Sequence, residues 1–107
     1  MNDDCLQVSV AAASPEEAER ITGSAVEQRL AACGQVIGPV ASTYRWEGKV
    51  ERAEEWLCLL KTTRARFPEL QRHILRTHSY RVPEIIATAI TAGAIDYLDW
   101  IRAETAS

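Results

Sequence analysis

The sequence predicts an α+β fold: a ferredoxin-like βαββαβ sandwich, in which two helices pack on a four-stranded antiparallel sheet, with an added C-terminal helix. Three observations predict it. Apolar segments typical of strands and segments with helix-start signals follow one another as strand, helix, strand, strand, helix, strand. A Glu-Gly pair between the second and third strands predicts a long hairpin. The 107 residues suit one domain, 1–107, without a linker or repeat.

The first strand and helix are predicted from alternation and from capping signals. Apolar residues alternate with polar ones over 6–10, which is typical of a strand with one buried face. Ser14 is a favoured N-cap, Pro15 suits the first helical position and Glu17 completes a capping box. Gly34 is the expected helix stop. The apolar stripe of this helix consists of Ala18, Ile21, Ala25 and Leu30.

The central hairpin is predicted from two segments rich in β-branched and aromatic residues, 36–46 and 50–63. The Gly38-Pro39 pair interrupts the first, and because proline donates no backbone hydrogen bond we expect a bulge or an edge there. The Glu47-Gly48 pair is the expected two-residue turn.

The segment Trp56-Leu57-Cys58-Leu59-Leu60 is apolar on both faces of its strand. Helices of the same chain are expected to cover one face only, so we expect a neighbouring subunit to cover the other. A charge at Leu59 or Trp56 is therefore expected to disrupt the assembly.

The remaining elements are a second helix, a loop, a fourth strand and a last helix. Pro68 opens the second helix, whose apolar face holds Phe67, Leu70 and Ile74. Residues 78–83 form a loop because Pro83 disfavours helix before it. A strand is expected over 84–91 and a helix over 94–104. The inward residues of that helix are expected to be Ile95, Leu98 and Ile101.

Composition limits the classes of partner. The formal net charge is −3 and the arginines of the second helical region are dispersed, so we expect no nucleic-acid binding. No apolar run reaches the roughly 18 residues that span a bilayer, so we expect no membrane insertion. Without an export signal, Cys5, Cys33 and Cys58 are expected to be reduced thiols in a cytoplasmic protein.

Six segments, in order, make the chain similar to the CutA family of divalent-cation tolerance proteins. They are residues 30–33 (LAAC), 44–49 (YRWEGK), 60–63 (LKTT), 78–80 (HSY), 82–85 (VPEI) and 96–100 (DYLDW). The resemblance implies a tight homotrimer built by the long second and third strands, with a fold similar to PII signalling proteins. It also implies a link to tolerance of copper and other divalent cations, and names no reaction.

Two residues depart from the family loop, which usually reads His-Pro-Tyr followed by a polar or acidic residue. Ser79 replaces the proline, so a less rigid loop is expected. Arg81 follows the tyrosine, and its guanidinium would repel a cation bound beside it.

Thiol and imidazole groups are the candidate metal ligands, because copper favours both. Cys33 and His78 are the preferred pair, pooled between subunits, since both lie in segments that resemble the family. The expected ion is Cu²⁺ or another divalent cation, bound weakly. Cys58 and His73 are interpreted instead as packing residues, and Cys33 has that alternative too.

An aromatic and charged set is the candidate ligand cleft between subunits, as the family resemblance implies. Its members are Tyr44, Trp46, Trp56, Lys61, Tyr80, Glu84 and Trp100, with His78 beside them. Glu84 is the expected partner of Lys61. The alternative is that the aromatic residues only seal an interface.

Two functions remain open at this stage, both without catalysis. The first is a trimer that binds divalent metal at inter-subunit clefts. The second is a PII-like signalling or scaffold trimer that binds a small anionic ligand or a protein partner, for which Arg81 is the motivating residue. No nucleophile motif is present, which leaves hydrolysis through His78 and Glu84 a weak third hypothesis.

Overall fold

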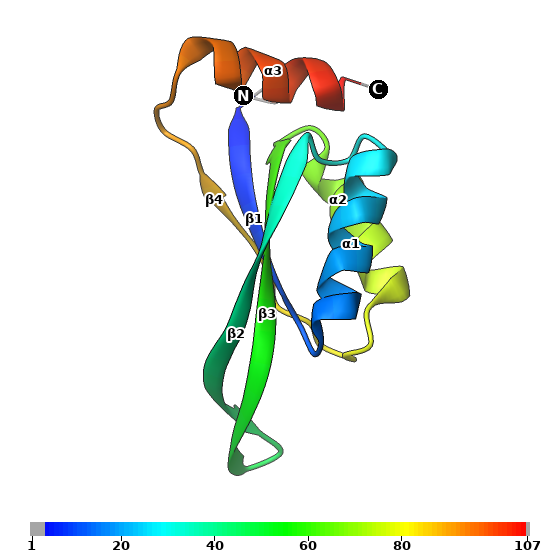
Figure 1. Cartoon of the computed structure of the whole chain (residues 1–107), viewed down its shortest axis with the longest axis vertical. Coiled ribbons are helices and arrows are strands. Elements are labelled where there is room, and N and C mark those ends of the chain that lie inside the picture. The colour runs from blue at the N-terminus through cyan, green and yellow to red at the C-terminus, as the bar shows by residue number, and fades with distance from the viewer. Residues whose placement is uncertain (1–3, 107) are drawn as a thin grey trace.

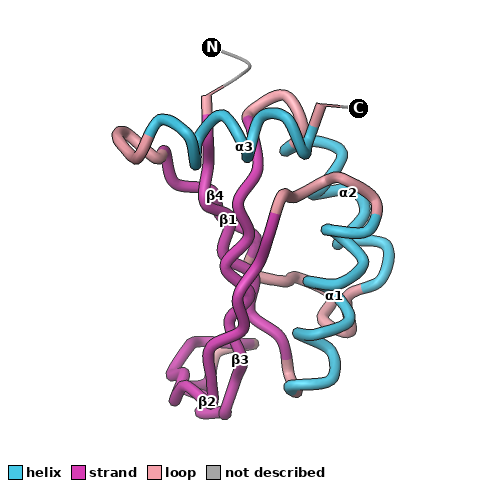
Figure 2. Tube along the Cα trace, turned by 45° about the horizontal axis from the view of Figure 1, so that its top comes forward, coloured by secondary structure: helices cyan, strands magenta, loops and turns pink. Residues whose placement is uncertain are grey.

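The computed structural model describes residues 4–106 and confirms the ferredoxin-like α+β sandwich (Figure 1). The elements in chain order are β1 (Cys5–Ala12), α1 (Pro15–Glu27), β2 (Cys33–Trp46), β3 (Lys49–Thr63), α2 (Phe67–Thr77), β4 (Ile85–Ala89) and α3 (Ile95–Thr105). The antiparallel sheet has the order β2-β3-β1-β4. Helices α1 and α2 lie on one side of it, and α3 crosses one end (Figure 2).

The main core lies between the sheet and the two packed helices. Its central side chains have no measurable exposure, and they come from both layers: Val8, Val10, Cys58, Leu60, Leu70 and Ile74. The four residues predicted for the stripe of the first helix, Ala18, Ile21, Ala25 and Leu30, are buried as well, although Leu30 follows the end of α1. Each fully buried aliphatic side chain contributes about 1.5–3 kcal/mol, so this layer holds the sheet and helices together.

The β2–β3 hairpin extends past the ends of the helices (Figure 1). Its pairing register shifts between Ile37 and Val40, which confirms the irregularity expected at Pro39. The turn has positive φ at both central residues, 50° at Glu47 and 81° at Gly48. Such a turn matches the twist of the strands it joins, as expected for a two-residue hairpin turn.

The second face of the sheet is only partly covered. Cys5 and Thr63 lie on it and are buried, and Cys5 packs against Ile101 of α3, so the expectation that no helix reaches this face was wrong at that end. Farther along, Leu57 and Leu59 stay half-buried, and Ile37 is 49% exposed. Helix α3 is too short to cover both ends, so a hydrophobic strip remains open to solvent.

Trp56 does not belong to that strip. It packs against the core on the helix side of the sheet, because its position in β3 alternates with those of Leu57 and Leu59. A Cβ atom at Gly38 would lie 2.3 Å from the Cδ1 atom of Trp56, so the glycine leaves room for the indole ring. A charge at Trp56 would therefore disturb the core, and its expected effect on assembly stays a prediction.

The predicted end of the first helix and the predicted orientation of Ile95 also differ from the structure. Helix α1 ends at Glu27, and the chain turns through a positive φ of 61° at Arg29. Gly34 is inside β2 instead of stopping the helix, and a Cβ there would lie 2.6 Å from side-chain atoms of both Leu60 and Thr22. The glycine thus allows α1 and β2 to approach closely. Ile95, expected to face inward, is 74% exposed.

Candidate functional site

A cavity of about 660 Å³ lies between the hairpin and the loop 78–84. We call it the hairpin cavity. The hairpin contributes two aromatic side chains and two carboxylates to its wall, from Tyr44, Trp46, Glu51 and Glu55. The loop contributes Tyr80, Arg81 and Glu84. Its volume lies in the range of small-molecule sites in proteins.

Tyr80 joins the two walls of the hairpin cavity. Its hydroxyl donates a hydrogen bond of 2.8 Å to Oε2 of Glu55. Burial raises the pKa of Tyr80 above its usual range, and the bond to Glu55 raises the pKa further. The phenol is therefore neutral at physiological pH and acts as a hydrogen-bond donor.

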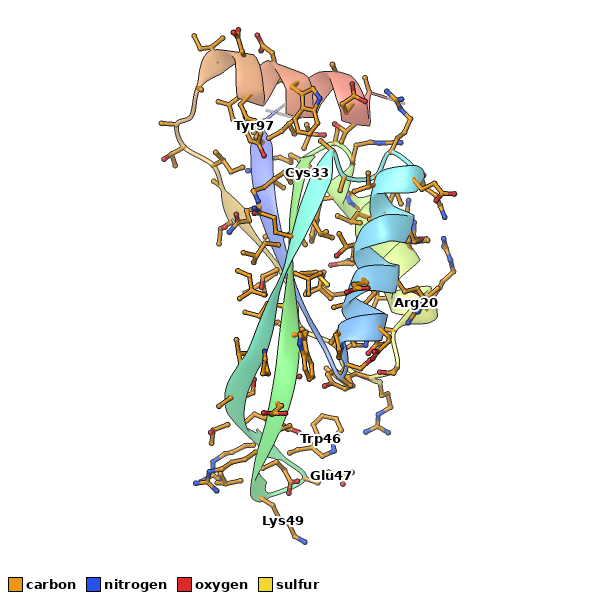
Figure 3. All side chains as sticks on the ribbon, in the orientation of Figure 1. Arg20, Cys33, Trp46, Glu47, Lys49 and Tyr97 are labelled. Atoms are coloured by element: carbon orange, nitrogen blue, oxygen red, sulfur yellow. The ribbon has the colours of Figure 1, made fainter. Side chains whose placement is uncertain are left out.

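Two residues that line the hairpin cavity form a cation–π contact. The guanidinium carbon of Arg81 lies 5.6 Å from the centroid of the Trp46 ring. Trp46 lies near the hairpin turn, close to Glu47 and Lys49 (Figure 3). Arg81, one of the two residues that depart from the family loop, thus contacts Trp46, which lies in a segment that resembles the family.

The loop 78–84 is held by a buried carboxylate, that of Glu17. Oε2 accepts from the backbone N–H of Ser79 at 2.8 Å, and Oε1 accepts from the Ser79 hydroxyl at 2.9 Å and from the Ala13 N–H at 3.1 Å. Burial alone would raise the pKa of Glu17, but the bonds from Ser79 and Ala13 outweigh it and lower the pKa. Ser79 therefore replaces the rigidity of a proline with two hydrogen bonds.

His78, one of the two predicted metal ligands, has both ring nitrogens bonded within the protein. Nδ1 accepts from the N–H of Tyr80 at 2.9 Å, so Nε2 carries the proton and donates to the carbonyl oxygen of Ala11 at 2.7 Å. The side chain is fully buried. A metal ion would have to break one of these bonds, so this geometry makes His78 a residue that positions the loop.

Cys33, the other predicted ligand, lies toward the α3 end of the sheet, beside Tyr97 (Figure 3). Its Sγ atom is 3.3 Å from the Tyr97 hydroxyl oxygen, and that contact raises the pKa of Tyr97. In the sheet register, Cys33 of β2 lies opposite Lys61 of β3, whereas the side chain of His78 bonds to the carbonyl oxygen of Ala11. Ala11 pairs with Leu57, so the two ligands are separated along β3 by about 13 Å.

One chain therefore does not bring Cys33 and His78 together. Within residues 4–106, no three His, Cys, Asp or Glu side chains are grouped to hold a metal ion. Cys58 is buried and donates to the Ala18 carbonyl oxygen, and burial raises the pKa of its thiol. His73 is buried too and bonds to the Ser24 hydroxyl. Both are packing residues, as expected.

The predicted ligand cleft is divided by the structure. Tyr44, Trp46, Tyr80 and Glu84 line the hairpin cavity, whereas Trp56 packs on the helix side and Trp100 stacks with Tyr97 on α3. The expected Lys61–Glu84 pair was wrong for the single chain: Lys61 donates to Oε1 of Gln35 at 3.3 Å. Glu84 accepts from the Ser9 hydroxyl at 3.4 Å.

Sequence reasoning missed three contributors to this site. Glu17 was interpreted only as part of a capping box, and nothing in its spacing from Ser79 signals their contact. Glu51 and Glu55 look like ordinary exposed residues of a charged strand. Their register opposite Tyr44 and Val40 is what places them at the cavity.

Comparison with known proteins identifies the family. The sequence profile described as CutA1 divalent ion tolerance protein matches residues 6–104. The chain belongs to the CutA1 family. A divalent-cation tolerance protein CutA of Thermus thermophilus is 43% identical over 98 residues, which cover 92% of this chain and 95% of that protein.

Solved structures of other CutA1 family members have the same fold. CutA from Xylella fastidiosa matches with a TM-score of 0.92 and 34% identity over 95% of this chain and 98% of that chain. The protein from Archaeoglobus fulgidus matches with a TM-score of 0.91 and 38% identity over 94% and 98%. That second structure is described as a periplasmic protein, so a cytoplasmic location for this chain stays a prediction. Within residues 4–106, no helix is both long and apolar enough to cross a membrane.

Proposed function

We propose that this chain acts in divalent-cation tolerance as a homotrimer, with Cu²⁺ bound weakly at clefts between subunits and without catalysis. Membership of the CutA1 family supports the tolerance role, and the family description names tolerance to ions without naming a reaction. A cytoplasmic location is part of the proposal, supported by the free thiols of Cys33 and Cys58.

The open strip on the second face of the sheet carries the trimer proposal. Leu57 and Leu59 are half-buried in the single chain, next to Ile37, which is 49% exposed. Assembly would remove this apolar surface from water, and each Å² buried contributes about 25 cal/mol. Three copies joined through their hairpins would cover the strip in each subunit.

Light scattering of Leu59→Asp tests the assembly. We expect the variant to dissociate, because an unpaired charge in an apolar interface costs several kcal/mol. Leu75→Asp is the matched control, since Leu75 is 50% exposed on α2, in the helix layer. Trp56→Asp no longer tests the interface, because Trp56 packs on the core. A trimer that persists in Leu59→Asp, or a wild-type monomer at micromolar concentration, would refute the proposal.

Cys33 is the thiolate that this proposal assigns to copper. It is partly exposed, whereas Cys5 and Cys58 are buried. His78 is the proposed second ligand, and binding through it requires the loop 78–84 to release Nδ1 or Nε2. Calorimetry of the reduced protein with Cu²⁺ is expected to show saturable heat that Cys33→Ala and His78→Ala each weaken. Cys58→Ala is the control, and unchanged binding in both test variants would contradict the assignment.

A second candidate function is a PII-like signalling trimer whose ligand or partner binds at the hairpin cavity. The cavity itself favours this candidate, because about 660 Å³ exceeds what a single metal ion needs. A thermal-shift comparison of metal ions with small organic ligands distinguishes the two. Stabilisation by metal ions alone would eliminate this second function.

A further inference from the structure

A serine hydroxyl and a buried imidazole meet between the two packed helices. The Oγ atom of Ser24, on α1, lies 2.5 Å from Nε2 of His73, on α2. Ser24 is partly exposed, whereas His73 is buried. The pair belongs to the helix layer (Figure 1), on the opposite side of the sheet from Leu57 and Leu59, so it lies outside the proposed subunit interface. A nucleophile and a base within hydrogen-bond reach are the geometric signature of an activated serine.

The hydroxyl proton of Ser24 is directed to the imidazole. Within residues 4–106, this hydroxyl makes no hydrogen bond besides the one to His73. Nδ1 of His73 is not among the fully buried polar atoms that lack a partner, so it reaches solvent. We therefore assign the ring proton to Nδ1, which leaves the lone pair of Nε2 to accept the hydroxyl proton.

His73 is in its neutral, basic form at neutral pH. Burial lowers the pKa of His73, and the positive charge of Arg76 on the same helix lowers the pKa further. The cation of the facing helix is Arg20, whose guanidinium donates to the Thr77 carbonyl oxygen at 3.2 Å and to Oε2 of Glu17 at 3.4 Å. A neutral imidazole can accept the proton that the serine must lose to act as a nucleophile.

The surroundings of Ser24 let an electrophile approach but do not favour turnover. Gly23, its neighbour, is exposed, and a Cβ atom there would meet nothing within 4 Å. The backbone N–H of Ser24 lies inside α1 and bonds within the helix, so it is not free to stabilise an oxyanion. An ester formed at Ser24 is therefore expected to persist, as at a modification site and not as in a hydrolase.

We propose that Ser24 is a reactive serine that accepts an acyl or phosphonyl group from a donor with a good leaving group, with His73 as the general base. Oγ forms the new bond to the carbonyl carbon or the phosphorus, and its proton passes to Nε2 of His73. The bond to the leaving group breaks, the leaving group departs with the electron pair, and His73 releases the proton to it or to solvent. One group is bound per chain, so the inference adds no turnover and rests on neither trimer formation nor copper binding.

Labelling with a fluorophosphonate, read by peptide mass spectrometry, tests the proposal. This probe modifies activated serine hydroxyls and spares thiols, and fluoride is its leaving group. We expect one adduct, at Ser24, in the folded protein and none in concentrated urea. Ser24→Ala should abolish it. His73→Gln keeps a hydrogen-bonding amide but no base, and it should slow labelling about 100-fold or more, as expected for loss of a general base.

Arg72→Gln is the matched control, because Arg72 precedes His73 on α2 and is exposed. Its labelling rate should equal that of the wild type. Near-UV circular dichroism verifies that each variant is folded, and the wild-type pH profile provides a test that does not depend on any variant.

The pH profile separates a general base from a contact that is only structural. The wild-type rate should rise as His73 loses its proton and level off by neutral pH, because the pKa of His73 lies below the ordinary value of about 6.5. A serine that depends on hydroxide would keep reacting faster as the pH increases. Absence of an adduct at Ser24, equal rates in wild type and His73→Gln, or a rate that continues to rise above neutral pH would each overturn the proposal.

Discussion

Replacing Glu17 with glutamine is expected to loosen the loop that forms one wall of the hairpin cavity. The carboxylate accepts from two backbone N–H groups through different oxygens, Ala13 on Oε1 and Ser79 on Oε2. A glutamine amide has only one acceptor oxygen. Whichever way the amide is turned, its NH₂ group faces one of these N–H donors, and that donor loses its partner.

The magnitude follows from the single bond that is lost. A hydrogen bond to a charged group contributes about 1.5–3 kcal/mol, so Glu17→Gln should lower the free energy of unfolding by about 2 kcal/mol. The pKa of Glu17 is lowered in the folded state, so this contribution is present above the unfolded pKa of about 4.3. It is lost as the pH falls through the folded pKa, where protonation gives the carboxyl an O–H donor.

Urea denaturation at fixed protein concentration, at neutral pH and in steps below pH 4, measures both expectations. The difference between wild type and Glu17→Gln should be largest at neutral pH and shrink on acidification. Glu19→Gln is the matched control, because it removes the same charge from an exposed position of the same helix. Equal stability of Glu17→Gln and Glu19→Gln at neutral pH would refute the reasoning, as would a difference that does not depend on pH.

Three further substitutions test the packing and the hairpin turn. Gly38→Ala should destabilise the fold by about 1–3 kcal/mol, because the new Cβ would lie 2.3 Å from Trp56; an unchanged urea midpoint would contradict this packing. Glu47→Asn should raise the thermal midpoint by relieving up to about 1 kcal/mol of left-handed strain at φ 50°, and a lower midpoint would argue against strain. Ile101→Ala should cost about 2–5 kcal/mol and expose α3 to limited proteolysis; resistance equal to wild type would disprove the docking of α3.

The sequence predicted the order of the elements because each is marked locally. Ser14 and Pro15 mark the start of α1, and the Glu47-Gly48 pair marks the hairpin turn. Alternation in β1 correctly identified Leu6 and Val8 as buried. These signals work because capping, turn geometry and side-chain alternation depend on residues close together in the chain.

The site was predicted less completely because its contacts join distant segments. Glu17 and Ser79 are 62 positions apart, and no local pattern marks their bond. Lys61 and Glu84 do not pair within the single chain, because the register places Lys61 opposite Cys33 and Glu84 lies near Ser9. Aromatic residues that look like one group in the sequence were divided between the two faces and the end of the sheet.

The three tryptophans lie at different places along a molecule whose longest dimension is 44 Å. Trp46 lies near the hairpin turn, Trp56 lies midway against Gly38, and Trp100 lies on α3 at the far end. Variants that retain one indole each would turn the chain into three fluorescent reporters. Binding at the cavity, opening of the sandwich core and detachment of the last helix would then be observed as separate optical signals in the same protein.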